Sequence, residues 1–77
     1  MPRFYFRQYV NGQWMAKDRR GREFASPAEA CTYGIRRAPA LLRRFLRPKV
    51  NTYLSTEISD GKRTLFIIRG KVISEKA

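Results

Sequence analysis

The stretch SPAEACTYGIRRAPALLRRFLRPK, residues 26–49, decides the fold because it predicts one long amphipathic helix. Ser26 is a favoured N-cap residue, Pro27 falls at the first helical position, and Glu29 completes a capping box. We expect the helix to run from Pro27 to about Leu46, because another proline follows two residues later and the residue before a proline avoids the helical conformation.

Pro39 falls inside this helix, where proline removes one backbone hydrogen bond and crowds the preceding turn. At about 100° per residue, five arginines share one arc of roughly 120°. They are Arg36, Arg37, Arg43, Arg44 and Arg47. The opposite side carries Cys31, Gly34, Ile35, Ala38, Leu41, Leu42, Phe45 and Leu46. Because one apolar stripe continues across Pro39, we predict a single kinked helix.

A β-hairpin is predicted ahead of the helix, over RFYFRQYVNGQWMAKD, residues 3–18. Asn-Gly at 11–12 is the strongest signal for a two-residue type I′ turn, which would pair residue 10 with 13 and residue 9 with 14. A type I turn over 18–21 should follow, because Asp stands at its first position and Gly at its fourth. Residues 22–24 then form a short third strand.

A second hairpin is predicted after the helix, over residues 51–73, with its turn at Asp60-Gly61. Period-two alternation then gives the strands two faces. One face would hold Leu54, Thr56, Ile58, Leu65 and Ile67. The other would hold Tyr53, Phe66 and Ile68. Both faces are partly apolar, so we expect the sheet to be covered on two sides, by a second chain or by the ends of this one.

The predicted order is therefore ββ(β)αββ, an α+β fold in which one kinked amphipathic helix covers one face of a small antiparallel sheet. With 77 residues, the chain is expected to form a single domain over 1–73, followed by a flexible tail over 74–77.

The composition argues against enzymatic chemistry. Histidine is absent, and Cys31 is the only cysteine, which leaves no familiar catalytic triad, metal site or intrachain disulfide. No glycine-rich phosphate loop is present. We therefore predict a protein that is not an enzyme and uses no cofactor. No apolar run approaches the length of a membrane span, and we expect a cytoplasmic protein.

The charge points to a polyanion instead. Seventeen Lys and Arg stand against six Asp and Glu, giving a net charge of +11, which favours nucleic acid as a partner. The candidate anion-binding residues are Arg36, Arg37, Arg43, Arg44, Arg47, Lys49, Arg19, Arg20 and Arg22. An alternative is that these residues form only a solvated surface, in a protein whose arginine content follows codon usage.

A second candidate surface lies on the first hairpin, where alternation would place Tyr5, Arg7, Tyr9 and Trp14 on one face. Bases of single-stranded nucleic acids stack on faces of this kind. We therefore predict a non-enzymatic protein that binds nucleic acid through charge rather than through base readout. The alternative is a protein-interaction module, either a homodimer or the partner of an acidic protein, in which another subunit covers the aromatic residues.

The opening MPRFYF, residues 1–6, and the stretch DRRGREF, residues 18–24, also carry a resemblance. They resemble a family of small uncharacterised bacterial proteins, a domain of unknown function, whose members open with Met-Pro-Arg-Tyr-aromatic-Phe and carry Asp-x-x-Gly-x-Glu before a single helix. The matching positions are Pro2, Arg3, Phe4, Phe6, Asp18, Gly21 and Glu23. The resemblance implies the same strand–helix–strand order, and it gives no catalytic residue to this chain because the family has no known site residues. The arginine-rich helix departs from the family pattern.

Overall fold

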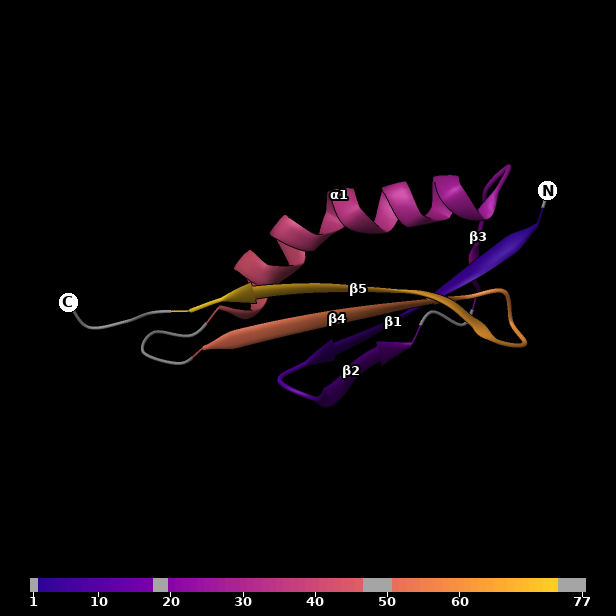
Figure 1. Cartoon of the computed structure of the whole chain (residues 1–77). Helices are drawn as coiled ribbons and strands as arrows, with labels where there is room; N and C mark the ends of the chain where they lie inside the picture. Colours follow the sequence, from indigo (N-terminus) through magenta and orange to yellow (C-terminus); the bar gives the residue numbers. More distant parts are fainter. Residues whose placement is uncertain (1, 18–19, 47–50, 74–77) are drawn as a thin grey trace.

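The computed structural model describes residues 2–17, 20–46 and 51–73, with the side chains of all of these except 14–17. Figure 1 shows one helix above one sheet. The elements in chain order are β1 (Arg3–Val10), β2 (Gln13–Lys17), β3 (Arg22–Glu23), α1 (Pro27–Phe45), β4 (Thr52–Ser59) and β5 (Thr64–Val72). The predicted α+β class and the order ββ(β)αββ are confirmed.

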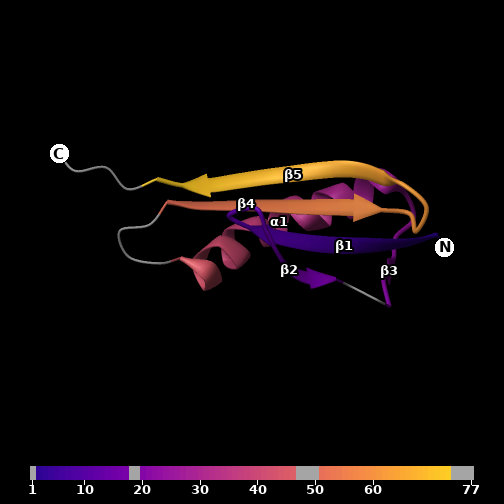
Figure 2. The same cartoon turned by 90° about the horizontal axis from the view of Figure 1, so that it is seen from below.

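The sheet is antiparallel throughout, with the strand order β2-β1-β4-β5 and with β3 paired to the start of β1. The turn between β1 and β2 has positive φ at both Asn11 (51°) and Gly12 (78°), as a type I′ turn requires. Val10 pairs with Gln13 and Tyr9 with Trp14, which confirms the predicted register. Figure 2 shows the sheet from its uncovered side, with α1 behind it.

Helix α1 begins as its sequence predicts. The Ser26 hydroxyl accepts a hydrogen bond from the Glu29 amide at 3.3 Å, and the Glu29 carboxylate accepts one from the Ala25 amide at 3.0 Å. The helix continues through Pro39 to Phe45, and it bends in its second half (Figure 1). One bent helix therefore spans the predicted range.

The core lies between α1 and the sheet. Its buried apolar side chains are Phe4, Phe6, Ala30, Leu41, Leu54 and Ile58. Gly34 lets the helix approach closely, because a Cβ atom there would stand 2.7 Å from the Ile68 Cδ1 atom. The helix packs mainly on β4 and β5 and touches β1 less.

Ile35 does not join this core, contrary to its predicted place on the core-facing stripe. Its side chain is 54% exposed. Ile35 lies about 120° around the helix from the buried Leu41. The stripe that contacts the sheet is therefore narrower than the apolar arc in the sequence.

The turn of the second hairpin is longer than predicted. Ser59 pairs with Thr64, so four residues, 60–63, connect the strands, and the register shifts between Ile58 and Ser59. As a result, Phe66 pairs with Ile58 and Ile68 with Thr56. Cross-strand partners share a face.

The predicted faces of this hairpin were therefore wrong for three residues. Phe66 and Ile68 lie on the helix side and pack against the core, whereas Ile67 lies on the uncovered side and is 50% exposed. Tyr53 lies on the uncovered side, as predicted, and is 47% exposed.

Within the two segments that carry the family resemblance, residues 3–4 lie beside residues 22–23. Arg3 pairs with Glu23 in the backbone ladder, and their side chains form an ion pair at 3.2 Å. The Arg3 guanidinium also donates to the Arg20 carbonyl oxygen at 2.9 Å. The backbone pairing and the Arg3–Glu23 ion pair thus hold β3 against the start of β1.

Candidate polyanion-binding surfaces

The predicted binding residues divide between two surfaces, because α1 covers only one face of the sheet (Figure 1). The first, which we call the helix face, consists of Arg36, Arg37, Arg43 and Arg44. The second, which we call the open face, is the uncovered side of the sheet. Its described side chains are Tyr5, Arg7, Tyr9, Tyr53, Ser55, Glu57, Ser59, Ile67, Arg69 and Lys71.

All four arginines of the helix face are exposed. Arg36 and Arg43 lie roughly 140–160° around the helix from the buried Leu41, so they point away from the sheet. Arg37 and Arg44 lie about 40–60° from Leu41, on one flank of the helix. None of the four forms an ion pair with any residue in the described part of the chain.

Tyr33 brings two arginines together from different elements. The Tyr33 hydroxyl accepts a hydrogen bond from Arg37 at 3.0 Å and another from Arg22, on β3. The Arg22 guanidinium carbon lies 4.6 Å from the centre of the Tyr33 ring, which is the geometry of a cation–π contact. Two guanidinium groups therefore converge on one hydroxyl oxygen.

The Tyr33 ring is itself held by the aromatic edge of the core. Its centroid lies 5.6 Å from that of Phe6 and 5.3 Å from that of Phe24. These contacts fix where Arg22 and Arg37 meet. The helical spacing of Tyr33 and Arg37, four residues apart, could have indicated their contact. The sequence carried no signal for the contact with Arg22, which depends on how β3 meets α1.

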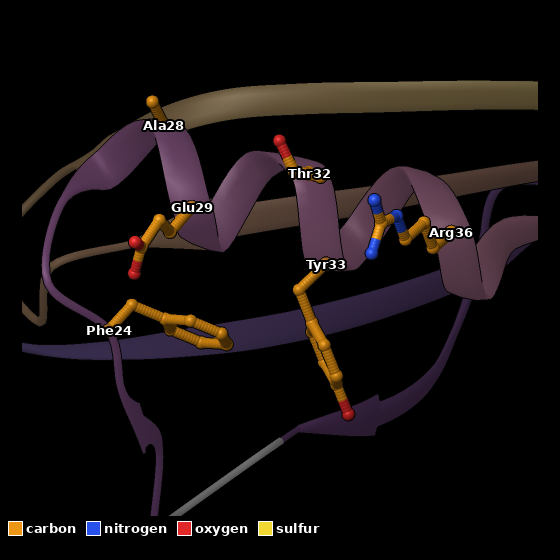
Figure 3. A pocket seen from close by; sticks show the side chains of 6 residues that line it. All are labelled: Phe24, Ala28, Glu29, Thr32, Tyr33 and Arg36. Carbon is orange, nitrogen blue, oxygen red and sulfur yellow. The ribbon is translucent and has the colours of Figure 1, made fainter.

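A surface hollow of about 380 Å³ adjoins this cluster (Figure 3). Its lining residues are Phe24, Ala28, Glu29, Thr32, Tyr33 and Arg36. Glu29 stands at one end and Arg36 at the other, with the two aromatic rings on the sheet side (Figure 3). The Glu29 carboxylate accepts the hydrogen bond of the Ala25 amide at the start of the helix, and it forms no ion pair with Arg36.

On the open face, Tyr5, Arg7 and Tyr9 lie together as predicted, because alternate residues of β1 point to the same side. The backbone of Trp14 pairs with Tyr9, but the Trp14 side chain lies outside the described residues. The predicted stacking residues did not include Tyr53, which joins this face from β4 and is exposed.

The Tyr5 ring is held between two loops. A Cβ atom at Gly21 would lie 2.9 Å from one edge of the ring, and a Cβ atom at Gly61 would lie 3.3 Å from the other. Both tyrosines of β1 are partly buried, so they offer less surface for stacking than Tyr53 does.

The remaining predicted residues are placed as follows. Arg20 is exposed, and its carbonyl oxygen accepts the hydrogen bond from Arg3. Arg19, Arg47 and Lys49 lie outside the described residues.

Within residues 2–17, 20–46 and 51–73, no group of three or more His, Cys, Asp or Glu side chains could hold a metal ion. No helix in these ranges is long and apolar enough to cross a membrane.

Comparison with known proteins gives no match to a family model, to a curated protein or to a solved structure. The resemblance of residues 1–6 and 18–24 to a bacterial family therefore stays a prediction. The Arg3–Glu23 ion pair gives two of the matching positions a structural role that needs no ligand.

Proposed function

We propose that the protein is not an enzyme and that it binds the phosphate backbone of nucleic acid through the helix face together with Arg22. The observation that carries the proposal is the convergence of Arg22 and Arg37 on the Tyr33 hydroxyl. Two like charges held side by side repel each other, and an anion between them offsets this repulsion by attracting both. Guanidinium groups bind phosphate oxygens with two parallel hydrogen bonds, so phosphate fits this arrangement.

Charge rather than sequence would govern such binding. Arg36 and Arg43 are separated by about 10.5 Å along the helix axis, a distance over which duplex DNA presents about six phosphate charges. Many alignments of the helix on the backbone would therefore place a phosphate within reach of each arginine. Contacts to phosphates position a protein on nucleic acid but carry no sequence information.

The test is a salt series with a mixed-sequence duplex and a single strand. The double variant Arg36→Gln/Arg43→Gln removes two charges that form no ion pair with any described residue. The stability of the protein should therefore hardly change. On a duplex, the slope of log affinity against log salt should become shallower by about 1.8, because each neutralised phosphate contributes about 0.9.

The matched control is Arg69→Gln/Lys71→Gln, which removes the same charge from the open face. Its slope should change by less than about 0.9, the contribution of one phosphate. The proposal is wrong if the two double variants change the slope equally, or if the wild-type protein shows no binding near about 50 mM salt, where charge-driven binding is strong.

A second candidate function is association with another protein through the open face. Tyr53 and Ile67 leave about half of their surfaces exposed there, beside the exposed Arg69 and Lys71. An apolar patch with a basic border fits an acidic protein. Sedimentation equilibrium distinguishes the forms of this candidate: a dimer that Ile67→Lys dissociates would support self-association. A monomer that binds polyglutamate as tightly as nucleic acid of equal charge would support an acidic partner.

A further inference from the structure

A small basic pocket lies between β1 and the turn that connects β4 to β5. Its volume is about 120 Å³. The lining residues are Arg7, Ser59, Gly61, Lys62, Arg63 and Thr64. Three of these side chains are cationic and two carry hydroxyl groups, while none is a carboxylate. The pocket thus combines positive charge with hydrogen-bond donors of the kind that bind an oxyanion.

The acidic residues nearest in the chain, Asp60 and Glu57, do not line the pocket. The Asp60 carboxylate accepts hydrogen bonds from the backbone amides of Arg63 at 3.0 Å and Lys62 at 2.9 Å, and these bonds lower the pKa of Asp60 below its usual value. The positive charge of Arg63 lowers this pKa further, so Asp60 shapes the turn and offsets part of the charge of Arg63, although it does not line the pocket. Glu57 stands opposite Arg7 in the strand register but forms no ion pair with it.

Hydrogen bonds within the turn fix its backbone before any ligand binds. The Ser59 hydroxyl oxygen accepts the Gly61 amide hydrogen at 3.1 Å, and the Asp60 amide donates to the Arg63 carbonyl oxygen at 3.2 Å. Gly61 also packs against the Tyr5 ring. Because the backbone of the turn is already fixed, binding a ligand orders only the exposed side chains of Arg7, Lys62 and Arg63.

We propose that this pocket binds one phosphate group and prefers a phosphomonoester to a phosphodiester. Three cations match a dianion better than a monoanion, and a monoester carries close to two negative charges at neutral pH. Arg7 and Arg63 can each form paired hydrogen bonds to phosphate oxygens, and Lys62 adds a point charge. The pocket shares no residue with the helix face, so this proposal can be tested independently of the proposed function.

The test follows backbone amide signals by NMR while inorganic phosphate is added and sodium chloride keeps the ionic strength constant. The amide signals of residues 59–64 should shift together and saturate. Arg7→Gln/Arg63→Gln should weaken this response by about tenfold or more, the loss expected for one charge-assisted hydrogen bond. The matched control Arg69→Gln/Lys71→Gln removes equal charge from the other end of β5 and should leave the response unchanged.

Two results would overturn the proposal. One is a response spread over the basic surface without a cluster at 59–64, and the other is an equal response in the two double variants. A further variant, Glu57→Gln, removes the carboxylate opposite Arg7 and should tighten phosphate binding. Looser binding in Glu57→Gln would contradict the electrostatic account.

Two further comparisons identify the source of the phosphate. Phenyl phosphate should bind more tightly than dimethyl phosphate, and equal binding would refute the preference for a monoester. A 5′-phosphorylated oligonucleotide that displaces inorganic phosphate, where the same strand with a 5′-hydroxyl does not, would assign the pocket to nucleic-acid ends. If phenyl phosphate displaces inorganic phosphate and neither strand does, the ligand is a small phosphate ester.

Discussion

Replacing Gly21 by alanine should destabilise the protein far more than replacing Gly12, although both glycines have a left-handed backbone. Their φ angles are similar, 70° for Gly21 and 78° for Gly12. An L-residue in this conformation costs about 1–2 kcal/mol. The two substitutions therefore share one energetic term, and the difference between them comes from the surroundings of the new Cβ atom.

Those surroundings differ sharply. A Cβ atom at Gly12 would have no neighbouring atom within 4 Å. At Gly21 it would stand 2.8 Å from the Phe4 carbonyl oxygen and 2.8 Å from the Arg3 Cγ atom. A backbone oxygen cannot rotate away as a side chain can, so β3 must move away from β1. Overpacking of this kind costs about 1–3 kcal/mol.

The expected loss of unfolding free energy is therefore about 1–2 kcal/mol for Gly12→Ala and roughly 2–5 kcal/mol for Gly21→Ala. A chain of this size has a total stability of roughly 4–12 kcal/mol, so the second loss is a large fraction of it. Urea denaturation measures both losses, provided that the two variants keep the wild-type m-value.

A further pair separates backbone strain from steric crowding. Asparagine adopts the left-handed conformation more readily than alanine does. Gly12→Asn should therefore be close to neutral, whereas Gly21→Asn should stay strongly destabilising because its Cβ atom meets the same backbone oxygen. The reasoning is refuted if Gly21→Ala and Gly12→Ala have the same unfolding free energy, or if Gly21→Asn restores wild-type stability.

Three other outcomes are expected. Ile58→Ala removes a side chain that is fully buried and should cost about 2–5 kcal/mol in thermal or urea unfolding, whereas Ile67→Ala on the open face should cost far less. Tyr33→Phe should lower stability by about 1.5 kcal/mol or less and weaken nucleic-acid binding without changing its salt slope, because the arginines lose their common acceptor and keep their charges. The pKa of Asp60 is lower in the folded protein than in the unfolded chain, so its ionised carboxylate stabilises the fold above the unfolded-state pKa and stops doing so as the pH falls through the folded-state pKa. The stability advantage of wild type over Asp60→Asn should therefore shrink below about pH 4. An advantage that grows with acid would contradict this.

Local signals in the sequence predicted the elements well. Ser26 and Glu29 are close in the chain and cap the helix through short contacts, and Asn11-Gly12 forms the turn that those two residues favour. The second hairpin was harder to predict, because Asp60-Gly61 also occurs inside a longer turn. There the Asp60 side chain binds two backbone amides and extends the loop to Arg63.

That longer loop changed which residues are exposed, because a shift of one residue in a strand moves every following side chain to the other face. Ile67 became part of the open face, and the basic pocket formed at the turn, where the sequence shows the basic residues Lys62 and Arg63 but does not place Arg7 beside them. The contact of Arg22 with Tyr33 was equally beyond prediction, since it depends on the packing of β3 beside α1.

Net charge alone does not distinguish a binding surface from a solvated one in an arginine-rich chain. Seventeen basic residues on a small domain must occupy the outer side of the helix and the uncovered side of the sheet, because the core excludes them. Charges on a solvated surface gain by lying apart. At Tyr33 two arginines from different elements meet at one oxygen, and at the β4–β5 turn Arg7 meets Lys62 and Arg63 around one pocket. Folding holds these cations together against their repulsion, and an anion bound between them would turn that repulsion into attraction.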